Sequence, residues 1–365
     1  MNPFNILFII PLPPPIHGST VMCQYIKDSK LINDEFDCDY VNLSASRNMG
    51  EVHAFKFIKI WRFIYAYLDV FFKLMTRRYA LCYVALAFHK SLLKDAPFVL
   101  LCKLFRRRVV IHLHGKGASQ DAGNAIYRWL LHITFRNTKV ILLSWRLYPD
   151  VEQFVKREDV SICPNGIPAV NYEYKERNNS VPRMLFLSNL IVSKGVLVLL
   201  DALKILKGKG YSFICDFVGG ETNEIDAKRF SEEVNKRELN RLTVYHGKKY
   251  GEEKEQLFDR ADIFVFPTFY NNECFPLVIL EAMQHGQPVV TTDEGAIPDE
   301  VIDGENGLIC KRQDAKSLAE CISQLLDDHD LRIRMGDDGF KKYNQYFTID
   351  AFELNMKNIL VEYLK

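Results

Sequence analysis

Two glutamates with seven residues between them are the side chains of this chain best suited to binding a polar substrate. Glu273 and Glu281 lie in the stretch NNECFPLVILEAMQHG, which spans residues 271–286. Pro276 is typical of the first turn of a helix, where its missing N–H would have no partner. Gly286 is typical of the residue that follows a helix end. The pattern predicts a helix from about Pro276 to His285, with Glu273 exposed in the loop before it.

The start of this helix is a candidate anion site. Free N–H groups near Phe275, Pro276, Leu277 and Val278 would carry the positive end of the helix dipole and could bind a phosphate. One carboxylate could then hold sugar hydroxyls and the other a ribose. The alternative is an ordinary amphipathic helix that carries two surface glutamates.

The segment NECFPLVILEAM resembles the E-x7-E segment of the retaining, nucleotide-sugar-dependent glycosyltransferases of family 4, also called glycosyl transferases group 1. Further matches follow the family order: PNGI at residues 164–167, the pair Lys194-Gly195, Gly219-Gly220, and a Gly-x-x-Gly tail at 304–307. The resemblance implies an α/β protein of the GT-B fold, with two Rossmann-like domains facing across a cleft. It implies transfer of a sugar from a UDP- or GDP-sugar to an acceptor hydroxyl, with retention of configuration.

Continuous apolar runs indicate buried parallel strands in both halves of the chain. They cover residues 5–10, 81–88, 109–114 and 139–144, and then 183–190, 213–220, 261–268 and 288–292. We expect an acceptor-binding domain at residues 1–168, a nucleotide-sugar-binding domain at 169–347, and a C-terminal helix at 348–365 that crosses back to the first domain and is capped by Asp350. Residues 170–182 are polar and fit a linker.

In the first domain, Gly18 and His114 are the candidate site residues. Gly18 follows the first strand in a loop that is not G-x-G-x-x-G, which argues against a dinucleotide site. The resemblance places such a glycine near the donor phosphates. The alternative is that Gly18 is needed only for a tight turn. His114 lies at the end of a strand and shares a face with His112, which is the second choice. The resemblance implies that His114 contacts the donor sugar.

In the second domain, the resemblance assigns Lys194 to the donor diphosphate and places Gly219 and Lys248 beside the nucleotide. The family has a Gly-Arg pair where this chain has Ser188 and Asn189, so one positive charge is missing. Asn can donate only a weaker hydrogen bond than a charged group. Either a basic residue elsewhere compensates, or the donor binds less tightly.

The predicted mechanism stabilises a departing diphosphate through Lys194 and the helix N-terminus, so no metal cofactor is expected. Glu273 would orient the donor sugar and Glu281 the ribose, and neither is assigned as a nucleophile. Two other functions stay open: a nucleotide-sugar epimerase of the same fold, and a non-catalytic nucleotide-sugar-binding protein.

The net charge of +1 conceals an asymmetry, because residues 1–168 hold 22 Lys and Arg against 13 Asp and Glu, a net +9. The basic, aromatic stretch at residues 51–78 could lie on a membrane surface. Alternatively, it could pack against the sheet, with its Lys and Arg stems covering apolar surface. We expect a lipid-linked or other saccharide acceptor in cell-surface polysaccharide synthesis, peripheral contact with an anionic membrane that weakens with salt, and no nucleic-acid partner. Nine scattered Cys and a start without a basic leader favour the cytoplasm.

Overall fold

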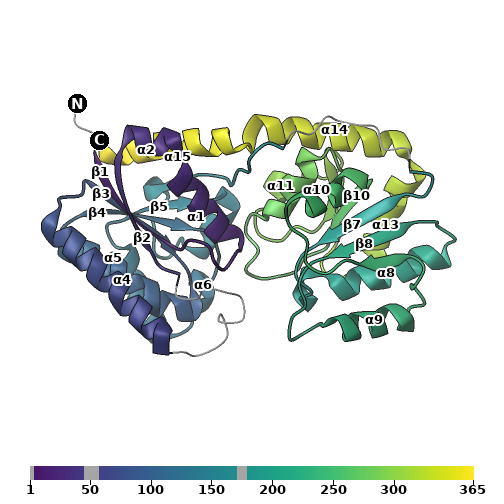
Figure 1. Ribbon diagram of the computed structural model, residues 1–365, viewed down its shortest axis with the longest axis horizontal. Helices are drawn as coiled ribbons and strands as arrows, with labels where there is room; N and C mark the ends of the chain where they lie inside the picture. The colour runs from purple at the N-terminus through teal and green to yellow at the C-terminus, as the bar shows by residue number, and fades with distance from the viewer. Residues whose placement is uncertain (1–3, 45–56, 171–178) are drawn as a thin grey trace. The chain divides into compact units, whose positions relative to one another are not determined.

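The computed structural model describes residues 4–44, 57–170 and 179–365 of the chain (Figure 1). It divides into two compact units: unit 1 is Met1–Gly166 with Ile349–Lys365, and unit 2 is Ile167–Thr348. The predicted linker at 170–182 falls largely on residues 171–178, outside the described residues. Residues 51–56 of the predicted aromatic helix also fall outside them.

Unit 1 is built on a parallel sheet with strand order β2-β1-β3-β4-β5-β6. Four of its strands lie close to the predicted apolar runs, because such runs are buried when a parallel sheet is covered on both faces. The partly exposed strand at residues 37–42 and the short strand at 160–162 were not predicted. The strands are β1 (Asn5–Ile10), β2 (Asp37–Asn42), β3 (Leu81–Leu86), β4 (Arg108–Leu113), β5 (Lys139–Leu142) and β6 (Val160–Ile162). The helices are α1 (Gly18–Asp28), α2 (Lys30–Glu35), α4 (Phe57–Thr76), α5 (Leu92–Leu104), α6 (Ala118–Asp121), α7 (Ala125–Phe135) and α15 (Ile349–Leu364), with short 3-10 turns at His89–Ser91, Trp145–Asp150 and Arg157–Asp159.

The C-terminal helix α15 packs within unit 1, beside α2 (Figure 1). The Tyr363 hydroxyl donates to Ser161 Oγ at 2.8 Å, and Lys357 pairs with Glu35 at 2.6 Å. The prediction that Asp350 caps this helix is wrong, because the helix begins at Ile349 and Asp350 lies inside its first turn.

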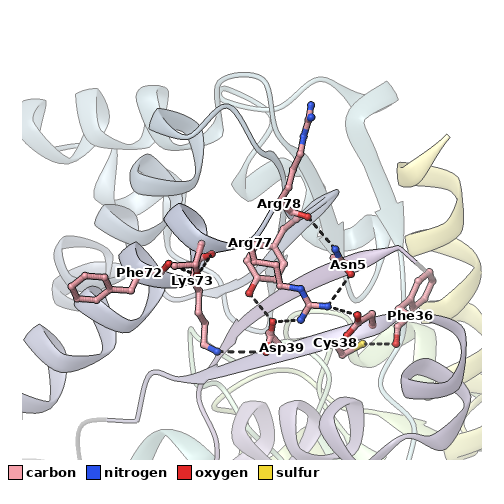
Figure 2. Close-up of polar contacts among 11 residues, drawn as sticks. Asn5, Phe36, Cys38, Asp39, Phe72, Lys73, Arg77 and Arg78 are labelled. Atoms are coloured by element: carbon pink, nitrogen blue, oxygen red, sulfur yellow. Dashed lines mark hydrogen bonds and ion pairs between the residues drawn. The ribbon is translucent and has the colours of Figure 1, made fainter. Parts of the chain in front are cut away.

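Helix α4 is fixed to the sheet by ion pairs at its C-terminal end (Figure 2). Arg77 donates to Asp39 Oδ2 at 2.6 Å and also pairs with Asp37, while Lys73 lies 3.5 Å from Asp39 Oδ1. Tyr79 donates a further hydrogen bond to Asp39 at 2.6 Å. Burial acts to raise the pKa of Asp39, but the hydrogen bonds from Tyr79 and Arg77 outweigh it and lower that pKa.

Unit 2 has the strand order β12-β11-β10-β7-β8-β9, in which the direction of winding reverses between β7 and β10. Ligands of such sheets bind outside the carboxyl ends of the strands at this reversal. The strands are β7 (Arg183–Leu187), β8 (Ile214–Val218), β9 (Thr243–Tyr245), β10 (Ile263–Phe266), β11 (Val289–Thr291) and β12 (Gly307–Ile309). The helices are the 3-10 turn η4 (Val192–Lys194), α8 (Val196–Gly208), α9 (Ala227–Lys236), α10 (Gly251–Arg260), α11 (Leu277–Gln284), α12 (Ile297–Glu300), α13 (Ala315–Asp327) and α14 (His329–Tyr346). None of the described helices is long and apolar enough to cross a membrane.

Candidate functional site

Two of the predicted site residues, Lys194 and Glu273, are in direct contact near the carboxyl ends of β7 and β10. Lys194 lies in η4, shortly after β7, and its Nζ contacts Glu273 Oε2 at 2.5 Å. Thr268, two residues after β10, donates to the same carboxylate oxygen at 3.2 Å. The Lys194 ammonium also lies 4.6 Å from the centre of the Tyr270 ring. The structure therefore joins a cation and a carboxylate that are far apart in the sequence.

The expectation that Glu273 is exposed is wrong, because only 8% of the residue is accessible. Loops pack closely around it: a Cβ on Gly295 would lie 2.2 Å from the Glu273 carbonyl oxygen. A Cβ on Gly195, which has a φ of +89°, would lie 2.2 Å from the Pro267 carbonyl oxygen. The glycine of the Lys-Gly pair thus lets η4 approach the end of β10 and brings Lys194 to Glu273.

Helix α11 begins close to the predicted position. Pro276 is its N-cap residue rather than part of its first turn, and it has no N–H to donate. Leu277 and Val278 are the first helical residues, so their N–H groups have no carbonyl partner within the helix. Phe275 is buried, with its ring 5.5 Å from that of Phe347, and orders the loop before the helix.

Glu281 lies in the middle of α11, and it faces α10 instead of the Lys194–Glu273 pair. Its Oε1 accepts from Lys254 Nζ at 2.9 Å, and Lys254 lies 3.4 Å from Glu255 as well. Burial raises the pKa of Glu281, and Lys254 opposes this effect. Sequence reasoning did not identify Lys254, because its sequence distance from Glu281 gives no local signal.

A second cluster gathers the residues that replace the family Gly-Arg pair. Asn189 Oδ1 accepts a hydrogen bond from the Gly220 N–H at 3.1 Å. A Cβ on Gly220 would lie 2.9 Å from that oxygen and 3.2 Å from Lys248 Nζ. A Cβ on Gly219, at φ +150°, would lie 1.8 Å from the Ser188 carbonyl oxygen. The glycines at the end of β8 therefore allow the Ser188 backbone to approach Gly219, and the side chains of Asn189 and Lys248 to approach Gly220.

Lys248 is the exposed cation of this cluster. It forms no ion pair with any residue that the structure describes, whereas the neighbouring Lys249 pairs with Glu253 at 2.5 Å. The two lysines are adjacent in the sequence, and only the folded structure distinguishes the one that faces Asn189.

In unit 1, a cavity of about 490 Å³ lies at the carboxyl ends of the strands, near the winding reversal between β1 and β3. His114 and His17 line it, together with Lys59, Lys90 and Lys94. This position agrees with the rule that ligands gather at such reversals. Asp95 also lines it and pairs with Lys94 at 3.3 Å, so the three lysines leave a net positive lining that favours an anionic ligand.

His112 lies in β4 and His114 directly follows the strand, and their ring centres are 4.0 Å apart. His112 is fully buried and contacts the Tyr83 hydroxyl through Nδ1. Both ring nitrogens of His114 lack a hydrogen-bond partner among the described residues. Burial lowers the pKa of His114 to about 4, so its ring is neutral at physiological pH.

Gly18 is the first residue of α1, and His17 and Ser19 on either side of it line the same cavity. Gly18 has no positive φ, and a Cβ there would meet open space, so the tight-turn interpretation is wrong. Within the described part of the chain, no group of three or more His, Cys, Asp or Glu side chains could hold a metal ion.

Comparisons with known proteins agree on one family. Residues 170–342 match the family model "Glycosyl transferases group 1". Over 257 residues the chain is 25% identical to an uncharacterized glycosyltransferase of Methanocaldococcus jannaschii, covering 69% of this chain and 68% of the relative. It is 28% identical over 182 residues to the capsular polysaccharide biosynthesis glycosyltransferase CapM of Staphylococcus aureus, covering 49% of this chain and 46% of CapM.

A solved structure has a similar fold. Anabaena HepE in complex with UDP-glucose matches with a TM-score of 0.75 and 19% identity, over 98% of this chain and 99% of HepE. At 19% identity this structural match shows the fold alone, and the predicted α/β, GT-B class with two Rossmann-like sheets is confirmed.

Proposed function

We propose that the chain, whose residues 170–342 match the glycosyl transferases group 1, moves a sugar from a UDP- or GDP-sugar to the hydroxyl of a saccharide acceptor, with retention of configuration. The observation that carries the proposal is the Lys194–Glu273 pair beside the N-terminus of α11. The HepE complex contains UDP-glucose, which supports UDP as the nucleotide.

The donor diphosphate would bind to Lys194 and to the N–H groups of Leu277 and Val278. These groups supply positive potential where charge develops on the leaving diphosphate, so metal-independent binding is expected. Because Glu273 already contacts Lys194, the diphosphate would compete with a carboxylate for that ammonium. Glu273 would then be released to orient the sugar hydroxyls. Glu281 would hold the ribose, and His114 would contact the donated sugar.

Lys248 would supply the positive charge that the family places at Asn189. Its ammonium lies close to the Asn189 side chain at the end of β8. No described residue neutralises it, so it can pair with a diphosphate oxygen. A charge-assisted hydrogen bond of this kind is about twice as strong as a neutral one. The replacement of the family Arg by Asn189 would therefore cost little donor affinity.

The acceptor would be an anionic, lipid-linked saccharide of cell-surface polysaccharide synthesis. The three lysines around the His114 cavity would suit the phosphate of such an acceptor, and similarity to CapM points to capsule-type products. The chain would then work in the cytoplasm, peripherally at the inner face of the cell membrane.

A screen of UDP- and GDP-sugars in excess chelator tests the proposal. Release of nucleoside diphosphate with each donor is measured with and without saccharide acceptors, and the product is analysed for anomeric configuration. Acceptor-dependent release with a retained linkage is expected. Release that requires a divalent cation would contradict the metal-independent site, and isomerised donor without transfer would indicate an epimerase.

The role of Lys248 has a matched control in Lys249. Lys248→Ala should weaken UDP binding by about tenfold, the usual value of one charged hydrogen bond, while Lys249→Ala should change it by less than about twofold. Adding Asn189→Arg to Lys248→Ala should restore binding. Equal effects of the two lysine variants, or failure of the rescue, would show that Lys248 does not replace the family Arg.

A further inference from the structure

The outer face of α4 is apolar over its whole length. Nine large apolar side chains of this helix are exposed in the described structure, among them Trp61 at 68%, Tyr65 at 74% and Phe72 at 58%. Single exposed apolar residues need no explanation, but a contiguous patch on one helix indicates an interaction surface. The opposite face, with Ala66, Val70 and Leu74, already packs into the core of unit 1.

The charged residues of α4 do not cover this patch. At about 100° per residue, Lys59, Arg62, Asp69 and Lys73 fall within an arc of about 80° on one flank. The exposed apolar residues occupy a separate arc of about 160° that contains no charge. Lys73 is turned toward Asp39 of the sheet, while Phe72 points away from that network (Figure 2). Helix α4 does pack against unit 1, as the second interpretation predicts, while its charged residues lie on the flank of the exposed apolar face.

The composition of the patch fits the interface of a bilayer. Trp and Tyr prefer the boundary between lipid headgroups and acyl chains, and Ile, Leu and Phe extend below it. A helix of 20 residues lying flat covers about 30 Å of membrane surface. Unit 1 holds 24 Lys and Arg against 16 Asp and Glu, a net +8. An anionic bilayer attracts this charge, whereas a second copy of unit 1 would repel it.

The patch also continues toward the candidate acceptor site. Trp61 and Tyr65 line a cavity of about 530 Å³ together with Leu43 and Ser44, at the end of β2. Leu43 and Ser44 also line the cavity that holds His114. A molecule anchored in lipid at Trp61 would therefore lie next to that cavity.

We propose that α4 is an in-plane membrane anchor, whose apolar face inserts into the interface of an anionic lipid bilayer. The inference deepens the proposed function, because it rests on a lipid-linked acceptor being presented to unit 1 from the same bilayer. It also changes the expected response to salt. Electrostatic attraction weakens as salt rises, but the inserted apolar face retains part of the binding.

Vesicle flotation of the full chain tests the anchor. The double variant Trp61→Gln/Leu68→Gln is compared with the control Ile126→Gln/Trp129→Gln, which changes exposed residues of α7 in the same unit. On vesicles of equimolar phosphatidylcholine and phosphatidylglycerol, the α4 variant should partition at least about tenfold less strongly per side chain replaced, while the control matches the wild type. Wild-type binding should fall only in part at high salt.

Tryptophan fluorescence locates the contact directly. A Trp129→Phe/Trp145→Phe chain retains Trp61 alone, and its emission should shift to the blue and resist acrylamide quenching when the same vesicles are added. A Trp61→Phe/Trp145→Phe chain retains Trp129 and should not respond. Equal vesicle binding by the α4 and control variants would overturn the anchor. A wild-type dimer that the α4 variant dissociates, without vesicle binding, would assign the face to a second copy.

UDP affinity, measured by calorimetry on the same proteins, separates this inference from the proposed function. Loss of vesicle binding with UDP binding and transfer to a soluble acceptor intact would refute only the anchor. Vesicle binding without donor binding or transfer would refute only the function.

Discussion

The contact between Lys194 and Glu273 should stabilise unit 2 and compete with the donor. Only 15% and 10% of the two side chains are exposed, and the N–O distance is 2.5 Å. Removing one partner of a buried pair costs about 3–5 kcal/mol, whereas an exposed pair contributes about 0–1 kcal/mol. We expect Glu273→Gln and Lys194→Met each to destabilise unit 2 by about 3 kcal/mol. The double variant should cost less than the sum.

The loss can be measured by differential scanning calorimetry of the full chain. The transition of unit 2 is identified as the one that UDP shifts upward, because a ligand stabilises the unit that binds it. For a unit of this size, about 3 kcal/mol corresponds to a decrease in Tm of about 6–12 °C. A decrease below about 3 °C for Glu273→Gln would show that the pair is no stronger than a surface ion pair.

Ligand binding should respond asymmetrically to the same two changes. Lys194→Met removes a cation and should weaken UDP binding, whereas Glu273→Gln removes a competitor and should leave UDP binding unchanged or tighter. Sugar transfer should be lost in both, because Lys194→Met removes the cation that would stabilise the leaving diphosphate and Glu273→Gln removes the carboxylate that would orient the donor sugar. Equal losses of UDP affinity in the two variants would refute the competition between Glu273 and the diphosphate.

Three further outcomes are expected. The folded-state pKa of His114 lies near 4, below its ordinary value of 6.5, so the unfolded chain binds more protons between these values and stability falls as pH drops through that window. His114→Gln should flatten this part of the stability curve, and an unchanged slope in urea unfolding would contradict it. Asp39→Asn should destabilise unit 1 by about 1–3 kcal/mol at neutral pH. Because the pKa of Asp39 is lowered in the folded state, the destabilisation should vanish in acid as pH falls below 3.8 and through the folded-state pKa. A destabilisation that persists there would argue against the ion pairs. Gly219→Ala should destabilise unit 2 and weaken UDP binding, because the added Cβ would strike the Ser188 carbonyl; wild-type Tm would refute the close approach.

Local patterns in the sequence predicted much of unit 2. Helix α11 lies within one residue of its predicted ends, because Pro276 and Gly286 act on their immediate neighbours and need no distant partner. Buried strands such as β1 could also be predicted, since its continuous run of five apolar residues fits a covered parallel sheet. The E-x7-E segment and the Lys-Gly pair also pointed to the family whose model matches residues 170–342.

Contacts between residues far apart in the sequence were decided by the tertiary structure alone. Glu273 is buried because loops after three strands converge on it, which its position before a helix could not reveal. The proximity of Lys248 to Asn189 arises from neighbouring strand ends, and the sequence could not distinguish Lys248 from Lys249. The sequence showed that α4 is aromatic and basic, but which of its faces packs depends on the sheet beneath it. Periodicity fixes the angular positions of side chains around a helix, whereas burial of one side is determined by the partner that the fold supplies.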